Sequence, residues 1–409
     1  MGAAYLSLRA AELRQRVRAL YALASPCRLC PRACGVRRDK GERGFCRAGI
    51  LPWVASYGPH FGEERVLVGR GGSGTIFLAG CNLGCLYCQN YTISHLGEGE
   101  EMPVEDLAQI LLHLQEIGCE NANFVTPTHQ APQIVDAVSR AVSDGFRLPL
   151  VWNCGGYEGV EALRLLSGIV DIYMPDFKYG DNAVAAALSG APDYVDRAQD
   201  ALREMHRQVG DLLVEGGIAV RGLLVRHLVL PGGLAGTEEV LRFLRDEISP
   251  QTFVNLMAQY YPAGRAAEVP ELSRRITPAE FAHALKLAQE LGLSRAGPAE
   301  GGTSSPVEAR SPSRRDDAHV ARETLCSRAD RGPPRGSAGH GQPPDLPPQP
   351  GVPRPVRRAP GQTPEVPLHG AASAPVRLLL HRDDGGRGAQ LRGKEGPPRG
   401  ERGVCQAVV

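Results

Sequence analysis

Short apolar segments alternate with amphipathic helical patterns from residue 74 onward. The apolar segments are typical of strands buried on both faces, because few polar residues interrupt them. They occupy residues 75–79, 122–125, 149–152, 169–174, 219–230 and 252–257. The helical patterns between them occupy residues 103–117, 131–145, 158–167, 193–210 and 237–247. This alternation predicts an α/β fold with a parallel sheet, either a partial (β/α)6 barrel or a doubly wound sheet.

Two further regions flank this α/β pattern. Residues 8–24 carry apolar side chains at helical spacing with arginines between them, which predicts an amphipathic helix. Residues 295–409 contain no Phe, Trp, Tyr, Ile, Met or Asn, but carry 18 of the 33 prolines. Such a segment cannot bury enough apolar surface to offset the entropy of ordering it, so we expect disorder. An out-of-frame translation of a GC-rich gene would have the same composition.

The chain therefore divides into three regions: an N-terminal helix and Cys-rich segment (1–73), the α/β region (74–293) and the tail (294–409). The net charge of +1 predicts no general attraction to nucleic acids or anionic membranes. No apolar run approaches the ~20 residues of a membrane span, and we identify no export signal. The 11 cysteines of such a chain favour metal binding in a reducing cytoplasm over disulfides.

The strongest candidate for chemistry is the loop after the first predicted strand. It carries Cys81, Cys85 and Cys88 in a CxxxCxxC spacing. Three thiolates on one loop can ligate a soft metal centre and leave one coordination position open, which favours catalysis. A structural zinc ion usually has four protein ligands, and no further Cys or His occurs before His95. A non-catalytic zinc-binding adaptor is the alternative.

A second cysteine group precedes the predicted sheet. It comprises Cys27, Cys30, Cys34 and Cys46. Four cysteines within twenty residues can form a tetrahedral zinc site or hold a second iron–sulfur cluster. The alternative is a loop whose cysteines only pack beside the main site. The remaining cysteines are isolated: Cys119 and Cys154 are expected to be buried, and Cys326 and Cys405 lie in the tail and are not counted as ligands.

Polar residues follow several of the predicted strands. Thr126 and Thr128 follow the second strand, Asn153 follows the third, and Asp176 and Lys178 follow the fourth. The carboxyl ends of parallel strands meet at one edge, where α/β folds bind ligands, so we expect these side chains to line a polar site. Asn153 could instead cap a helix, and Asp176 with Lys178 could form a structural ion pair.

The CxxxCxxC loop, with Tyr87 directly before its third cysteine, resembles the signature of radical S-adenosylmethionine (SAM) enzymes. The resemblance favours the partial barrel and implies that Cys81, Cys85 and Cys88 hold a 4Fe-4S cluster whose fourth iron binds SAM. It implies an oxidoreductase in which an electron, delivered by a reductant such as flavodoxin or ferredoxin, cleaves SAM to a 5'-deoxyadenosyl radical. It also implies that Tyr87 lies against the adenine of SAM, and that the strand-end residues contact the same cofactor.

Residues 27–293 further resemble pyruvate formate-lyase activating enzyme-like proteins, mainly through residues 27–34, 123–129 and 171–178. This finer resemblance implies a glycyl-radical enzyme as the partner. Two departures weaken it. Residues 126–128 (Thr-Pro-Thr) replace a Gly-Gly-Glu motif, and residues 259–261 (Gln-Tyr-Tyr) replace a histidine after the last strand. The Thr126 and Thr128 hydroxyls would then contact SAM, and the substrate could be another protein or a small molecule.

Overall fold

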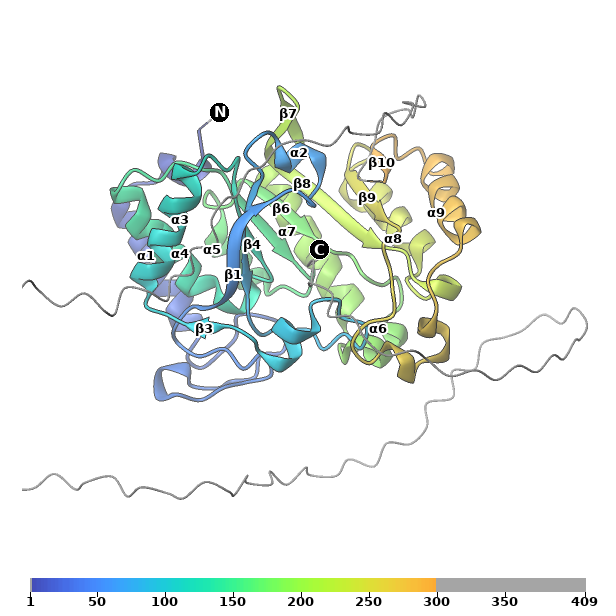
Figure 1. The fold of residues 1–409 in the computed structure, drawn as a ribbon, viewed down its shortest axis with the longest axis horizontal. Helices are drawn as coiled ribbons and strands as arrows, with labels where there is room; N and C mark the ends of the chain where they lie inside the picture. The colour runs from blue at the N-terminus through green and yellow to red at the C-terminus, as the bar shows by residue number, and fades with distance from the viewer. Residues whose placement is uncertain (1, 299–409) are drawn as a thin grey trace, which may run out of the picture. The chain divides into compact units, whose positions relative to one another are not determined.

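The computed structural model describes residues 2–298, which form a sheet surrounded by helices (Figure 1). Six parallel strands make up the centre of the sheet and lie in the order in which they occur along the chain. These strands are β2 (Ser73–Leu78), β4 (Ala122–Val125), β5 (Leu150–Cys154), β6 (Ile172–Pro175), β8 (Ile218–Leu228) and β9 (Phe253–Met257). The order never reverses, as it would in a doubly wound sheet, and the two ends of the sheet do not pair. The predicted partial barrel and its six strands are confirmed.

Additional strands that the sequence pattern did not predict extend both ends of the sheet. At one end, β1 (Trp53–His60) runs antiparallel to β2, and β3 (Glu100–Glu101) pairs with β1. At the other end, β10 (Ala296–Gly297) runs parallel to β9. A short strand, β7 (Leu213–Glu215), forms a hairpin with β8. The pattern missed β1 because the strand contains Gly58 and Pro59, residue types that usually interrupt strands.

The predicted helices are all present within a few residues of their expected ends. They are α1 (Ala10–Leu23), α3 (Val104–Glu116), α4 (Ala131–Ser143), α5 (Val160–Leu166), α7 (Tyr194–Val209) and α8 (Thr237–Phe243), which a π-helical turn (Leu244–Ile248) continues. Three further helices are α2 (Arg65–Val68), α6 (Asn182–Ser189) and α9 (Pro278–Glu290). A capping box formed by Thr277 and Glu280 begins α9, so a sequence signal for this helix existed.

The first residues of the chain dock onto residues far along it. The Ala4 backbone N–H donates to Asp171 Oδ1 (2.7 Å), while Oδ2 of the same carboxylate accepts from the Leu150 N–H (2.8 Å). The ring of Tyr5 is buried and stacks on Phe146, with centroids 5.9 Å apart. Side chains of α1 pack in the same hydrophobic core as the sheet. The N-terminal segment therefore contributes to the core of the α/β region, and the predicted boundary after residue 73 stays a prediction.

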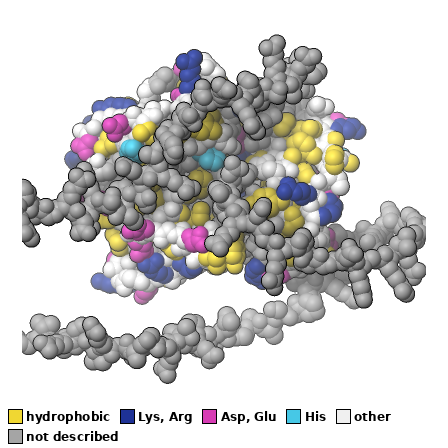
Figure 2. Space-filling model, in the orientation of Figure 1, with side chains coloured by type: hydrophobic (Ala, Val, Ile, Leu, Met, Phe, Trp, Pro, Cys, Tyr) yellow, Lys and Arg dark blue, Asp and Glu magenta, His cyan; other side chains and the backbone are white. Residues whose placement is uncertain are grey.

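The part of the chain that the structure describes contains no helix long and apolar enough to cross a bilayer. On the face shown in Figure 2, basic and acidic side chains are interspersed. The predicted disorder concerns residues 294–409. Of these, residues 294–298 are described and include β10, whereas 299–409 lie outside the described residues.

Replacing Gly222 tests how closely β8 packs against the backbone of Asp211 and Leu212. Its φ is 125°, and a Cβ at this position would lie 2.5 Å from the Asp211 carbonyl oxygen. We expect Gly222→Ala to lower the free energy of unfolding by about 3 kcal/mol, since both the φ angle and the packing are unfavourable.

Gly216, in the turn between β7 and β8, is the matched control. Its φ is 59°, but a Cβ there would meet no atom within 4 Å. We expect Gly216→Ala to cost only about 1 kcal/mol, from the left-handed backbone alone. Denaturant titration of both variants measures the difference, and equal losses would contradict this account of β8.

Candidate functional site

The three cysteines of the CxxxCxxC loop line one cavity of about 140 Å³. Gly80 makes the turn from β2 into this loop with φ 79°. The cavity wall also contains polar side chains from the carboxyl ends of five neighbouring strands, as expected for a parallel α/β fold. These side chains are Thr126, Asn153, Asp176, Lys178, Arg226 and Gln259.

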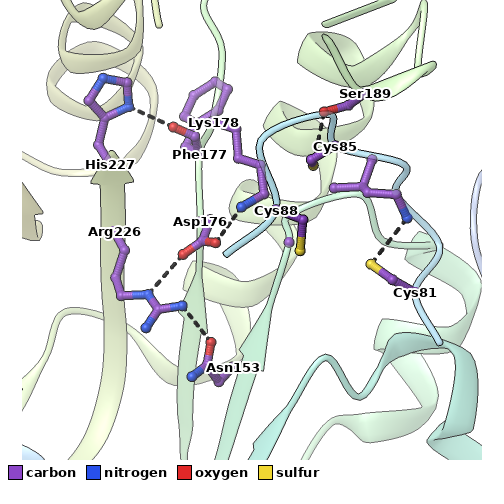
Figure 3. Close-up of polar contacts among 12 residues, drawn as sticks. Cys81, Cys85, Cys88, Asn153, Asp176, Phe177, Lys178, Ser189, Arg226 and His227 are labelled. Carbon is purple, nitrogen blue, oxygen red and sulfur yellow. Dashed lines mark hydrogen bonds and ion pairs between the residues drawn. The ribbon is translucent and has the colours of Figure 1, made fainter. Parts of the chain in front are cut away.

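Each cysteine sulfur of this loop has a hydrogen-bonding neighbour. The Leu83 N–H donates to Cys81 Sγ (3.3 Å), and Ser189 Oγ on α6 donates to Cys85 Sγ (2.9 Å), as Figure 3 shows. Cys88 Sγ lies 3.1 Å from Ser94 Oγ. Burial, together with the neighbouring Cys85 thiol, raises the pKa of Cys81 and of Cys88. A bound cation is therefore needed to hold these groups together as thiolates.

A 4Fe-4S cluster and a zinc ion place different demands on three cysteines. Within residues 2–298, no three Cys, His, Asp or Glu side chains stand close enough to enclose one metal ion. The three cysteines line one cavity wall. A 4Fe-4S cluster attaches its thiolates to different iron atoms and can leave one iron open, whereas the four ligands of zinc surround one atom.

A buried network of charged and polar groups forms the opposite wall of the cavity (Figure 3). Asp176 accepts from Arg226 Nε (2.8 Å) at one oxygen and from Lys178 Nζ (2.5 Å) at the other. Arg226 Nη2 also donates to Asn153 Oδ1 (2.7 Å). Burial alone would raise the pKa of Asp176, but Arg226 and Lys178 outweigh it and lower this pKa. Asp176 is therefore ionised between two cations.

The sequence analysis missed Arg226 and its second carboxylate neighbour, Glu63. Arg226 is only 5% exposed and lies in the apolar run that predicts β8, where no spacing marks it as functional. Its Nη1 lies 3.8 Å from Glu63 Oε2. Burial and the neighbouring Glu64 raise the pKa of Glu63. Asp176, rather than Glu63, is therefore the carboxylate that forms the close ion pair with Arg226.

Tyr87 and the two threonines occupy different places. Tyr87 lines the cavity, and its hydroxyl donates to Tyr179 Oη (2.7 Å). Thr126 also lines it, with φ 62°, a backbone conformation unusual for a threonine. The Thr128 side chain is buried outside the cavity wall, and its hydroxyl donates to Glu158. The structure brings Tyr87 and Thr126 to the cysteines but not Thr128.

One buried polar atom on the cavity wall has no partner. Asn153 Nδ2 makes no hydrogen bond, although the side chain is only 2% exposed. An unpaired buried donor is costly, so this atom marks a place for an acceptor on a bound molecule. SAM carries a carboxylate and ribose hydroxyls that could accept from Asn153 and Lys178. The donors present therefore fit SAM, and the cysteines fit the cluster.

A larger cavity, of about 880 Å³, lies at the opposite edge of the sheet. Its wall includes Ile218 and Phe253, the first residues of β8 and β9, together with Phe61 and Arg295. No cysteine lines it. The smaller cavity is the better candidate because it joins the cysteine loop to the carboxyl ends of the strands.

Comparison with known proteins identifies the family. The profile of the Radical SAM superfamily matches residues 75–220, which contain the cysteine loop, most of β2, the strands from β3 to β7 and the first residues of β8. The Uncharacterized protein MJ0674 of Methanocaldococcus jannaschii is 34% identical over 277 residues, covering 65% of this chain and 75% of the relative. The chain belongs to the radical SAM superfamily. Membership in this superfamily implies a 4Fe-4S cluster and SAM, and it supports an enzymatic function.

Other relatives and structural neighbours are more distant. The Uncharacterized protein MJ0808 of the same organism is 26% identical over 294 residues, covering 65% of this chain and 77% of the relative. Two solved structures are similar: HydG, a maturase of the FeFe-hydrogenase (TM-score 0.39, 13% identity), and anSMEcpe with bound AdoMet (TM-score 0.37, 11% identity). The matches cover 55% and 52% of this chain and only 50% and 55% of those structures.

The buried network predicts a large effect of replacing Arg226. Arg226→Gln leaves Asp176 paired with Lys178 alone and removes the donor to Asn153. We expect this variant to lose about 3 kcal/mol of unfolding free energy, because breaking a buried ion pair leaves one charge poorly compensated.

Arg242 provides the control for Arg226. It pairs with Glu238 at 2.6 Å on the surface of α8, and the two side chains are 53% and 45% exposed. We expect Arg242→Gln to cost less than about 1 kcal/mol. Urea unfolding of both variants is the measurement, and a loss for Arg226→Gln as small as that of the control would show that the network does not stabilise the fold.

Proposed function

We propose that this chain cleaves SAM reductively at a 4Fe-4S cluster held by Cys81, Cys85 and Cys88, and that the resulting 5'-deoxyadenosyl radical removes a hydrogen atom from a substrate. When bound, the cluster supplies the electron for the cleavage of SAM. One observation carries the proposal: the three cysteines and the polar strand ends line the same buried cavity.

The cavity residues would divide the binding of SAM between them. Lys178 would balance the charge of the SAM carboxylate, and Asn153 Nδ2 would donate to a carboxylate or ribose oxygen. Tyr87 would pack against the adenine, with its hydroxyl already bound by Tyr179. Thr126 would supply a hydroxyl at the wall. Because these side chains are largely buried, they would also exclude water from the reactive radical.

The electron would come from a small reductant protein such as flavodoxin or ferredoxin. A reducing cytoplasm would suit both this partner and the free cysteines of the described chain. The substrate class that the sequence resemblance favours is a glycyl-radical enzyme, which the chain would activate by removing a hydrogen atom from a glycine. Incubating the reduced protein with SAM and a candidate glycyl-radical enzyme, and recording the electron paramagnetic resonance spectrum, tests this narrower proposal directly.

Replacing one cluster ligand should abolish the reaction. In Cys85→Ala, the cluster would keep only two protein thiolates, so we expect 5'-deoxyadenosine release to fall at least 100-fold after anaerobic reconstitution and reduction with dithionite. Liquid chromatography of the quenched reaction measures the product.

Cys119→Ala is the matched control, since Cys119 is buried and does not line the cavity. This variant should release 5'-deoxyadenosine at the rate of the unchanged protein. Wild-type protein that binds zinc tightly and releases no 5'-deoxyadenosine would refute the proposal and favour a zinc-binding adaptor.

SAM binding should distinguish Asn153 from Thr128. Asn153→Ala removes a donor on the cavity wall, so we expect the Kd for SAM to rise about tenfold, as for the loss of one hydrogen bond to a charged group. Thr128→Val alters a hydroxyl that faces Glu158, so we expect the Kd to stay within about twofold. Calorimetric titration of the reconstituted variants with SAM measures both values, and the opposite ranking would place the cofactor beside Thr128.

A further inference from the structure

The four cysteines that precede the sheet lie together around one buried arginine. Cys27 and Cys46 are buried, at 2% and 4% exposure. Arg38 Nη2 lies 3.3 Å from Cys27 Sγ and 3.4 Å from Cys46 Sγ, in position to donate to both. The thiols of Cys27 and Cys46 are also near enough to Cys30 to raise its pKa, after burial as the main cause. These contacts define one group of sulfurs.

Cys34 belongs to the same group, although its residue is exposed on the surface. A Cβ at Gly44 would lie 2.5 Å from Cys34 Sγ, so this sulfur points at the backbone two residues before Cys46. Cys34 also contributes, after burial and Arg38, to the pKa of Cys27. The sulfurs of all four cysteines therefore face the same small region.

Arg38 is buried without a carboxylate partner. It is only 2% exposed, and no ion pair to it occurs within residues 2–298. Its Nη1 donates to the His129 carbonyl oxygen (2.6 Å), and its Nε has no hydrogen-bond partner. Burying a guanidinium costs several kcal/mol unless an anion compensates it. Among the described residues, the ionisable groups that accept hydrogen bonds from Arg38 are the sulfurs of Cys27 and Cys46.

As thiolates, these cysteines would need a further cation. Two thiolates would compensate Arg38, but four thiolates packed together would carry more negative charge than one arginine can balance. A metal ion or an iron–sulfur core supplies the missing positive charge and is the usual ligand of four closely spaced thiolates. Arg38 would then lie outside the metal and donate N–H···S hydrogen bonds to two of its ligands.

The backbone around these cysteines resembles that around the CxxxCxxC loop. The backbone N–H groups of Leu29 and Arg32 lie near enough to the sulfurs of Cys27 and Cys30, each two residues earlier, to lower the pKa of these thiols against the larger effect of burial. Leu83 makes the same contact with Cys81. Cys154 also has such a neighbour, in Gly156, but no second cysteine accompanies it. The combination of this contact with several clustered sulfurs is shared by the two cysteine groups.

We propose that Cys27, Cys30, Cys34 and Cys46 ligate a second metal centre, either a zinc ion or an iron–sulfur cluster, with Arg38 as a hydrogen-bond donor to its thiolates. The sulfurs draw closer when the metal binds, since they do not yet enclose a single ion. This proposal is independent of SAM cleavage, because it concerns cysteines outside the radical SAM cavity.

The second metal centre would stabilise the loop that carries Cys81, Cys85 and Cys88. A Cβ at Gly80 would lie 2.3 Å from the Cys46 carbonyl oxygen, so the backbone of Cys46 packs directly against the residue before Cys81. Arg32 Nε donates to the Asn82 carbonyl oxygen (2.9 Å) on the same loop. Metal binding at the N-terminal cysteines would therefore fix the position of the loop that carries Cys81.

Metal analysis of the full chain tests the proposal. In wild-type protein purified and reconstituted anaerobically, we expect about four iron atoms from the first cluster plus either about one zinc atom or about four more iron atoms per chain. Zinc or the additional iron each supports the second centre and identifies its metal. About four iron atoms with no zinc would overturn it, whether or not any variant folds.

Variants assign the second metal to its ligands. The triple variant Cys81→Ser, Cys85→Ser, Cys88→Ser should keep the second metal while releasing no 5'-deoxyadenosine. Adding Cys27→Ser and Cys46→Ser should remove it, whereas adding Cys119→Ser should not. A triple variant that shows the wild-type circular dichroism spectrum but holds no metal would overturn the proposal without affecting the assignment of the radical SAM site.

The rate of metal loss tests the role of Arg38 separately. In the same triple variant, Arg38→Met should lose the second metal to a chelator at least fivefold faster than Arg37→Met. Arg37 is the matched control because it is exposed and pairs with Asp39 at 3.4 Å. Equal rates of metal loss would show that Arg38 does not stabilise the thiolates.

Discussion

The buried ion pair between Arg226 and Asp176 is the constraint on which the site depends. A guanidinium and a carboxylate inside a protein must each find partners, because neither is solvated there. The partners come from three strands: Asp176 follows β6, Asn153 lies in β5 and Arg226 lies in β8. Matching these charges fixes the carboxyl ends of the three strands relative to one another. The wall of the cavity is therefore rigid before any cofactor arrives.

The cysteine loop completes the cavity on the other side by a different kind of contact. Its sulfurs accept from the Leu83 N–H and from the Ser189 hydroxyl, and its backbone is supported by Arg32 and Cys46. Ion pairs stabilise the wall that contains Asp176 and Arg226, whereas hydrogen bonds to sulfur stabilise the cysteine loop. A cofactor between the two walls would contact the cysteine sulfurs on one side and charged or polar side chains on the other. SAM suits such a cavity because it carries both a sulfonium group and a polar amino-acid group.

The sequence predicted the sheet well because its strands are buried on both faces and read as unbroken apolar runs. It predicted β4 with the observed bounds, yet missed β1, which contains Pro59. The spacing of Cys81, Cys85 and Cys88 predicted the centre of the candidate site. The sequence did not predict a role for Arg226, because a single arginine in an apolar strand forms no periodic pattern. Thr128 was predicted in the cavity, but the 3-10 turn Thr128–Gln130 directs its hydroxyl to Glu158.

The docking of Ala4 on Asp171 has a consequence for the order in which the molecule forms. This hydrogen bond joins residues 167 positions apart, and Tyr5 likewise binds the Leu148 carbonyl oxygen from 143 positions away. A ribosome makes the N-terminal residues first, so they must wait for β5 and β6 to be synthesised before they can dock. During that interval the thiols between residues 27 and 46 have no barrel to cover them. Newly made protein would thus pass through a stage in which these thiols are open to oxidants and to metal-delivery proteins.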